Sequence, residues 1–444
     1  MNLFRSLLLL LAFVVWLPLT TVAADLNAIG RWAESAAKGD SAALASLRHE
    51  AERHDPESQY RLGVLIFEGQ VVRRNFVQAA DLFRRAADKG HAAAHNALGH
   101  MLQHGLGIDR DEAQAAQWYE RAARLDNADA QNNFAWLLQE GRGRQRDFDQ
   151  AVTWYKKASA SGHVTAPYQL GLLYETGIAG AKDRVQALSW YRVAAERGEP
   201  MAQYKLGAAL ITGDSAVRDP DKGAAWLEKS AAQGNPLAKS MLATLLVKRG
   251  GKPSPDARIL GLATDAAKRG VPAAQRLLGT IYEQGLAAEK DPAAAIRWYR
   301  EAATRGDIDA QLPLAKLLDL GPKSVQDPVE AALWYGKASA AGGTEADLWL
   351  GLLYQEGRGI ARDEQQAFRH YQKAVEGGSV EALYRIAVLY DEGRGVARDT
   401  RRARDAYAAA ADKGHAGARE FLERLLKPAE RENDPFSPIK FGRF

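Results

Sequence analysis

Small and apolar residues recur along this chain every 36 residues. With Gly90 as the reference position, the residue four places further on is alanine in ten successive units, and the residue eight places further on is always apolar. Glycine occupies the reference position itself in nine of the ten units, with Asp126 as the exception. A period of this length indicates an array of helical repeats. No single repeat can bury its apolar face alone, so neighbouring repeats stack on one another.

Within each unit the pattern predicts two helices. Apolar offsets of four, eight and twelve residues lie near one helical face, which predicts a first helix from about +3 to +14. A glycine at +15 is expected to end this helix in eight units: Gly105, Gly141, Gly177, Gly213, Gly285, Gly321, Gly357 and Gly393. An aspartate at +21 is expected to cap the second helix in eight units: Asp111, Asp147, Asp183, Asp219, Asp291, Asp327, Asp363 and Asp399. The reference glycine is expected to end the second helix.

The side chains at the repeated positions predict how the hairpins stack. Alanine and glycine at +4 and +9 allow two helices to approach closely, and Trp-Tyr at +28/+29 is expected to fill the gaps between neighbouring hairpins. The fold class is therefore all-α: a right-handed α/α superhelical solenoid of ten 36-residue helix hairpins with terminal capping helices.

The repeat unit resembles a known family. The segments ADLWLGLLYQEGRGIARDEQQAFRHYQKAVEGG (346–378) and ALYRIAVLYDEGRGVARDTRRARDAYAAAADKG (382–414) are similar to the Sel1-like repeat, a relative of the tetratricopeptide repeat. The resemblance covers residues 55–414. It implies an α/α superhelix that serves as a protein-binding scaffold, without implying one biological process.

The chain is expected to have five parts. Residues 1–24 have the form of a signal peptide, and residues 25–54 form a capping helix pair. The ten repeats span 55–414, a capping helix spans 415–427, and residues 428–444 form a disordered tail. The sixth unit, 235–270, diverges most, because it lacks the loop glycine and the Trp-Tyr pair. It is either a hinge or docking loop, or sequence drift that its neighbours tolerate.

The first residues point to export. Arg5 precedes an apolar run from Leu7 to Leu19, and small residues end at Ala24. This predicts a cleaved signal and a periplasmic protein without a membrane span after cleavage; the alternatives are secretion or an uncleaved N-terminal anchor. The chain has no Cys, which excludes disulfides and Cys-based metal sites. Its 59 basic and 55 acidic residues are interspersed, which gives no footprint for nucleic acid.

The sequence offers no convincing catalytic or metal site. It lacks the serine-hydrolase elbow and the phosphate-binding loops, and its acids stand mainly at capping positions. His91, His95, His100 and His104 have spacings that zinc sites use, but the two pairs are rotated away from each other on the helix. His49 and His54 are one residue too far apart for the zinc-protease pattern. We therefore expect no cofactor, no metal and no catalytic residues.

Partner binding is expected on the first helices, at +6, +7 and +10. These positions face the concave groove in related helical repeats, and aromatic side chains there are typical anchors for a partner. The candidate residues are Tyr60, Trp136, Tyr168, Tyr204, Trp349 and Tyr384, with Asn96, Asn132 and Asn133 beside them.

The leading hypothesis is an exported, non-enzymatic interaction scaffold or adaptor for other proteins. Family resemblance associates such scaffolds with envelope assembly, polysaccharide export or signalling. The alternatives are a secreted or surface factor that engages host or neighbouring-cell proteins and, as a minor one, an enzyme or enzyme subunit. The sequence leaves the partner and the oligomeric state open.

Overall fold

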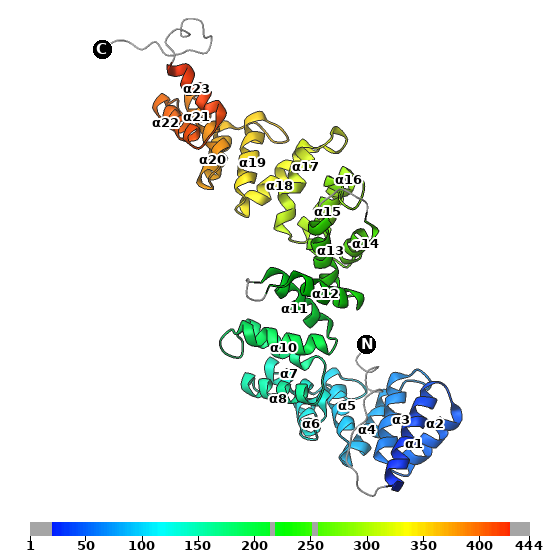
Figure 1. Cartoon of the computed structure of the whole chain (residues 1–444). Coiled ribbons are helices and arrows are strands. Elements are labelled where there is room, and N and C mark those ends of the chain that lie inside the picture. Colours follow the sequence, from blue (N-terminus) through cyan, green and yellow to red (C-terminus); the bar gives the residue numbers. More distant parts are fainter. Residues whose placement is uncertain (1–19, 214–217, 251–255, 427–444) are drawn as a thin grey trace. The chain divides into compact units, whose positions relative to one another are not determined.

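The computed structural model describes residues 20–213, 218–250 and 256–426. Within these ranges the chain is all-α and contains no β-strand, which confirms the predicted fold class (Figure 1). The chain divides into two compact units, residues 1–209 and 210–444, with the division inside α11. The predicted signal segment up to residue 19 and the tail after residue 427 lie outside the described residues.

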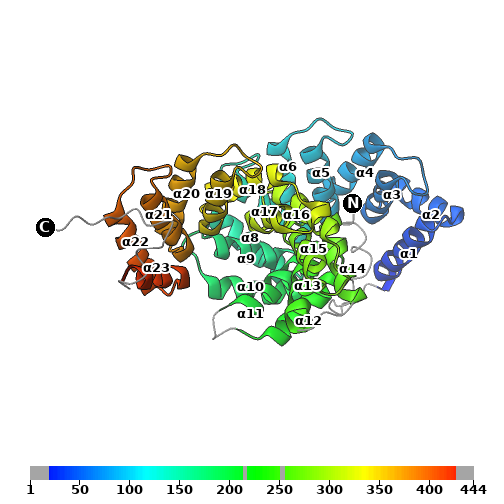
Figure 2. The same cartoon turned by 90° about the horizontal axis from the view of Figure 1, so that it is seen from above.

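Unit 1 contains the first helices of the chain in order. Its helices are α1 (Thr20–Ala37), α2 (Ser41–Glu52), α3 (Pro56–Glu68), α4 (Phe76–Asp88), α5 (Ala92–His104), α6 (Glu112–Arg124), α7 (Ala128–Glu140), α8 (Phe148–Ala160), α9 (Ala166–Thr176), α10 (Arg184–Glu196) and most of α11 (Pro200–Thr212) (Figure 2). The pair α1 and α2 occupies the segment expected for the N-terminal cap. Helix α1 begins upstream of the cleavage point predicted near Asp25.

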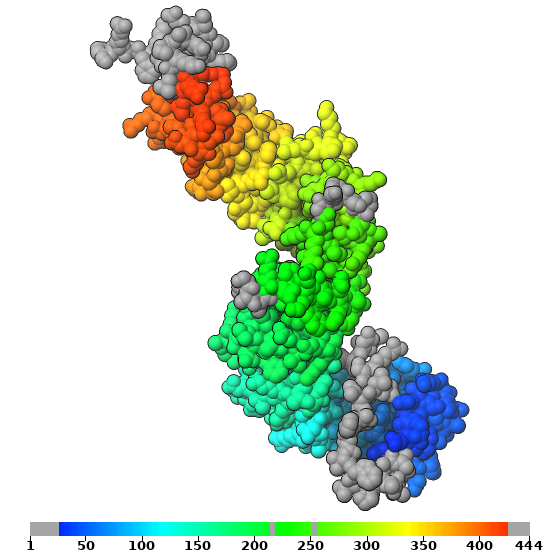
Figure 3. Space-filling model, in the orientation of Figure 1, coloured from blue at the N-terminus to red at the C-terminus, as the bar shows by residue number. Residues whose placement is uncertain are grey.

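Unit 2 continues the same alternation. Its helices are α12 (Pro220–Ala232), α13 (Pro236–Gly250), α14 (Ala257–Lys268), α15 (Pro272–Gln284), α16 (Pro292–Thr304), α17 (Gln311–Leu320), α18 (Pro328–Ala340), α19 (Thr344–Glu356), α20 (Glu364–Glu376), α21 (Val380–Glu392), α22 (Thr400–Asp412) and α23 (Ala416–Leu426). Side chains fill the spaces between the ribbons of this unit (Figure 3). The divergent sixth repeat is still a helix pair, α13 and α14, although the middle of its loop lies outside the described residues.

Helix capping follows the sequence pattern closely. All eight aspartates at +21 accept a hydrogen bond from a backbone N–H in the first turn of the second helix; Asp111, for example, accepts from Gln114. The nine reference glycines have φ between 81° and 97°, a region that costs glycine little. Asp126 takes the same left-handed turn with φ of 57°. The repeats therefore begin and end their second helices by the same local chemistry.

One loop departs from the expected ending of the first helix. Six of the eight glycines predicted at +15 adopt the left-handed conformation, as Gly141 does with φ of 69°. Gly321 instead is extended, with φ of −68° and ψ of −176°. The residue after it is Pro322, whose ring disfavours compact backbone conformations in the preceding residue. The prediction of a left-handed ending was therefore wrong for this loop.

Seven of the ten repeats have a tyrosine at +29, which locks the two helices of its hairpin together. In unit 1 Tyr119, Tyr155 and Tyr191 are fully buried, and in unit 2 so are Tyr299 and Tyr371. The ring lies over the small residue at +9 of its own hairpin: a Cβ added to Gly99 would come within 2.7 Å of the Tyr119 ring. These tyrosines reach the next hairpin as expected where Tyr335 stacks on Trp349, but their close packing inside their own hairpin was not predicted.

The hydroxyl of this tyrosine is satisfied in a repeated way. It donates to the side chain 16 residues earlier, at the end of the first helix: Tyr119 Oη lies 2.8 Å from Gln103 Oε1, and Tyr299 Oη lies 2.6 Å from Glu283 Oε2. Burial raises the pKa of both tyrosines well above its usual range. The tyrosine at +29 thus has a buried ring and a hydroxyl group with a hydrogen-bond partner.

The tryptophans at +28 are less enclosed than expected. Trp334 is buried, but Trp118, Trp154, Trp190 and Trp298 are only half-buried. Cations lie over several of the rings, as Lys157 does at 4.2 Å from the Trp154 centroid. The tryptophans therefore form a boundary between the core and the solvent.

Overpacking the lock tests its role. Gly279→Leu should lower the free energy of unfolding of unit 2 by about 1–3 kcal/mol, because any Cβ there overlaps the Tyr299 ring. Gly261→Leu is a matched control in the preceding hairpin, since no atom lies within 4 Å of its added Cβ. Urea unfolding followed by circular dichroism measures both. Equal destabilisation by the two variants would show that the contact does not hold the hairpin.

Candidate functional site

The first helices of unit 1 bring three predicted aromatic residues to a partly open face. Trp136 on α7, Tyr168 on α9 and Tyr204 on α11 are all half-buried. The Tyr168 ring lies 5.8 Å from the buried ring of Tyr191, and burial raises the pKa of Tyr168. Each ring is therefore rooted in the core and still open to solvent on one side, as an anchor for a partner requires.

Tyr60 does not belong to this face. Only 6% of its surface is exposed, and its ring stacks on that of His91 with centroids 4.6 Å apart. Burial raises its pKa to about 12. The expectation that Tyr60 is a groove residue was wrong, because the histidine that caps the following helix covers it.

Amide side chains accompany the aromatics on the unit 1 face. Asn133 Nδ2 donates to Asn96 Oδ1 of the preceding repeat at 3.0 Å. Arg142 lies 4.9 Å from the Trp136 ring centroid and is held there by an ion pair with Glu112. This face therefore offers flat rings, amides and a guanidinium, and we call it the unit 1 face.

The first helices of unit 2 carry the other two predicted aromatic residues. Trp349 on α19 and Tyr384 on α21 are half-buried, and Leu312, Leu348 and Leu352 lie at equivalent first-helix positions. The Trp349 ring stacks on Tyr335 with an interplanar angle of 15° and donates from Nε1 to Glu345 at 3.3 Å. Tyr384 stacks on His415 at 4.3 Å. We call this set the unit 2 face.

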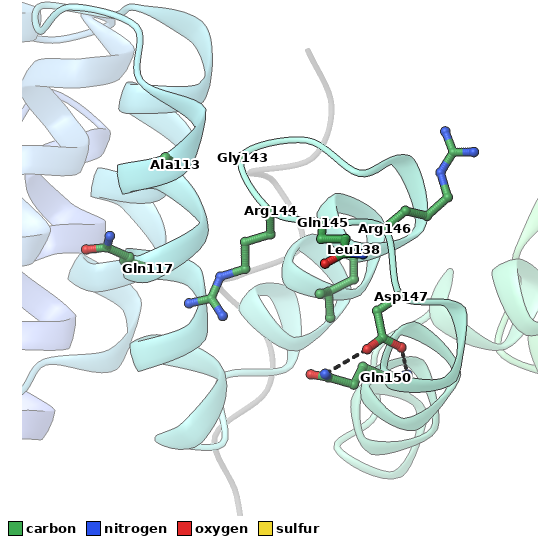
Figure 4. A pocket seen from close by; sticks show the side chains of 9 residues that line it. All are labelled: Ala113, Gln117, Leu138, Gly143, Arg144, Gln145, Arg146, Asp147 and Gln150. Atoms are coloured by element: carbon green, nitrogen blue, oxygen red, sulfur yellow. Dashed lines mark hydrogen bonds between the residues drawn. The ribbon is translucent and has the colours of Figure 1, made fainter.

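A cavity that the sequence did not indicate lies on the second-helix side of unit 1. It has a volume of about 580 Å³ and lies among α6, α8 and the loop before α8. In Figure 4, Arg144 extends from the loop toward α6 and Gln117, Arg146 points away, and Asp147 is bonded to Gln150. A smaller cavity of about 310 Å³ occupies the equivalent place one repeat later, against Tyr174. No sequence motif marks these two cavities.

The four clustered histidines do not come together in one site. His91 caps α5 by accepting from Ala94 N–H at Nδ1, and its Nε2 lies 2.9 Å from Glu57. His100 and His104 are side by side, with ring centroids 4.5 Å apart. Within the described ranges, no three His, Cys, Asp or Glu side chains come together in a way that could hold a metal ion.

The capping histidine recurs and joins successive repeats. His163 and His415 cap their helices in the same way, and the Nε2 of each faces a carboxylate of the preceding repeat, as in His415 and Glu381 at 2.9 Å. Burial would raise the pKa of Glu57, but the hydrogen bond from His91 and the charge of Arg61 lower it to about 2. These histidines therefore have a structural role.

One buried carboxylate in unit 2, Asp347, was not predicted from the sequence. Asp347 Oδ1 accepts from Ser339 Oγ at 2.7 Å and faces His370 Nδ1 at 2.9 Å. Ser339 and His370 bind the same oxygen rather than each other, so this histidine does not act as a base toward the serine. Asp347 stands at +5, where other repeats carry glutamine, and His370 stands at +28, where other repeats carry tryptophan. A position-by-position comparison of the repeats could have found both.

Among the described helices, none is both long enough and apolar enough to cross a bilayer.

The fold and these faces define an α-helical repeat protein with extended surfaces. The Sel1 repeat family model matches residues 56–91, 92–127, 128–163, 165–199, 200–235, 272–307, 308–343, 344–379 and 380–415. The chain therefore belongs to the Sel1 repeat family. The unmatched segment between 235 and 272 is the sixth repeat, the one that diverges most in sequence. Proteins of this family are generally non-enzymatic scaffolds and commonly bind other proteins.

The chain is also similar to solved structures. The chain is similar to c5321, a protective antigen present in uropathogenic Escherichia coli strains that displays an SLR fold, with 29% identity and a TM-score of 0.65 over 90% of this chain and 99% of that one. A Sel1 repeat protein from Oxalobacter formigenes is 26% identical, with a TM-score of 0.44 over 64% of this chain and 98% of that one. No curated protein matches this chain significantly.

The histidine pair predicts acid sensitivity in unit 1. Burial, together with the neighbouring His104, lowers the pKa of His100 to about 4, against 6.5 for a free histidine. Because the folded pKa is the lower one, neutral His100 contributes stability above pH 6.5 that is lost as the pH falls toward 4. With its partial exposure discounted, the contribution is roughly 1–2 kcal/mol.

Urea unfolding of the wild-type chain and of His100→Gln at pH 7 and pH 4 measures this loss. The wild-type protein should lose more stability between the two pH values than the variant does. An equally steep loss in the variant would contradict the assignment to His100.

Proposed function

We propose that the chain is an exported, non-enzymatic scaffold that holds partner proteins on the first-helix faces of its two units. The observation that carries this proposal is the partial exposure of Trp136, Tyr168 and Tyr204 on consecutive first helices. The repeat does not require aromatic side chains at these positions, since other units place Ser, Thr or Ala there. Large rings that the fold does not need, at the surface, are typical binding anchors.

The two faces differ in chemistry, which supports an adaptor role. The unit 1 face combines rings with asparagine amides, whereas the unit 2 face combines Trp349 and Tyr384 with leucines. A partner segment whose backbone N–H and C=O groups bind amides suits the unit 1 face, and an apolar partner segment suits the unit 2 face. One chain could thus hold two different partners.

Export rests on the N-terminal sequence alone. The apolar run from Leu7 to Leu19 followed by small residues supports translocation and a periplasmic location. Envelope assembly, polysaccharide export and signalling are processes in which such a scaffold would serve. Cell fractionation tests the location: recovery mainly in the culture medium would contradict a periplasmic protein.

A secreted or surface factor is the second candidate. The similarity to c5321, which is described as a protective antigen, favours it over the remaining alternatives. Protease treatment of intact cells separates the two candidates, because a surface protein is digested and a periplasmic one is not.

Removing the unit 1 anchors should weaken partner binding without unfolding the protein. The triple variant Trp136→Ala, Tyr168→Ala and Tyr204→Ala removes three rings that together should lower affinity at least about a hundred-fold. Crosslinking in cells identifies the partner, and calorimetry with that partner measures the affinity.

The control changes surface residues on second helices of the same unit, Thr153→Ala and Ser189→Ala, which should leave affinity unchanged. Circular dichroism should show the same helical content in all variants. Loss of cooperative unfolding in the triple variant would mean that these rings belong to the core and that the unit 1 face is not a binding surface.

A further inference from the structure

Two aliphatic side chains stand out on the second-helix side of unit 2. Val329 and Leu333, at +23 and +27 of their repeat, lie four residues apart on α18 and so share one helical face. They are 67% and 57% exposed, respectively. Their neighbours Ala332 and Tyr335 are buried, so the core side of α18 is already occupied. The exposed face is an additional apolar feature that the stack does not use.

Comparison with other repeats shows that this feature is not periodic. The same two positions hold Ala113 and Gln117 on α6 and Asp149 and Thr153 on α8. Val77 on α4 and Val185 on α10 are also exposed, but the residues four places later are Asp81 and Ser189. The eighth repeat alone, 307–342, has two branched aliphatic residues at these positions.

Basic side chains flank the aliphatic pair. Arg297 on α16 and Arg369 on α20 occupy the position of Leu333 in the adjoining repeats, and Lys337 and Lys373 lie one turn further on. All four are exposed, and within the described chain none of them forms an ion pair. Lys337 lies over the Trp334 ring at 3.9 Å. We call Val329, Leu333 and these four cations the α18 ridge.

The three helices of the ridge are held in register. Arg300 on α16 makes a bidentate pair with Glu330 on α18, both bonds being 2.7 Å long. Glu330 also accepts from Trp334 Nε1 at 3.0 Å. The loop before α20 lies so close to the start of α18 that a Cβ at Gly359 would overlap the backbone of Pro328. The cations and the aliphatic residues therefore keep one layout.

We propose that the α18 ridge docks an acidic amphipathic helix of a partner protein. Aliphatic residues at i and i+4 form a short ridge of the kind that fits the groove of another helix. Four unpaired cations around it favour a helix whose flanks carry Asp and Glu and disfavour a basic one. An anionic bilayer fits less well, because two aliphatic side chains bury too little area for stable insertion. This surface is separate from the first-helix faces, so it would let the scaffold hold another protein.

Site-directed crosslinking in cells that produce the full chain tests this proposal. A photo-crosslinking side chain at position 333 should capture a protein segment that is helical in pattern, apolar at i, i+4 spacing and rich in Asp and Glu. The same probe at position 153, the equivalent place on α8, is the matched control and should not capture that segment.

Charge reversal completes the test. Arg297→Glu with Arg369→Glu should reduce the adduct at least about ten-fold, while Arg297→Lys with Arg369→Lys should retain most of it. Circular dichroism must show that every variant keeps its helices. Absence of any adduct, a lipid adduct, a captured segment without acidic residues, or an adduct unchanged by charge reversal would overturn the proposal. None of these outcomes would contradict the proposed binding of a partner to the unit 1 face.

Discussion

The contact of the tyrosine at +29 with the small residue at +9 is the constraint on which the repeats depend. The Tyr299 ring lies against Gly279 with no room for a further carbon, and its hydroxyl bonds to Glu283. This one side chain thereby sets the distance between the two helices and binds a side chain in the last turn of the first helix. Hairpins of uniform thickness can then stack with the same spacing. The family model does not match the sixth repeat, which carries Ala263 at +29, although it matches the fifth, which carries Leu227 there.

Local chemistry made much of the fold predictable. Asp111 and its seven equivalents cap the second helices as expected, because a capping aspartate acts on amides within three residues. The left-handed ending of the first helix failed at Gly321, where the following proline changes the backbone preference. Features that depend on neighbouring side chains were harder to predict from the sequence. Nothing in the repeat shows that His91 covers Tyr60, or that the tryptophans remain half-exposed, since both depend on packing between helices.

The candidate site depends on the difference between residues that repeat every 36 positions and residues that do not. Periodic residues are used by the stack: aspartates cap, tyrosines lock, and the histidines at helix starts join repeats through carboxylates such as Glu57 and Glu381. The shifted pKa values of these periodic residues therefore result from their structural roles. Residues that break the period, such as Trp136, Tyr384 and Leu333, have no such role and reach the surface. The sequence could identify them as exceptions, but only the packed structure shows which of them remain open.

Hydrogen exchange of the full chain, alone and saturated with the partner captured in cells, tests the central claim most directly. The claim is that recognition uses first-helix side chains that the repeat does not require. The account predicts that amides of α7 and α9 gain protection on binding, while the turns at the reference glycines Gly162 and Gly198 do not change. Protection confined to those turns, or gained equally in every repeat, would contradict it.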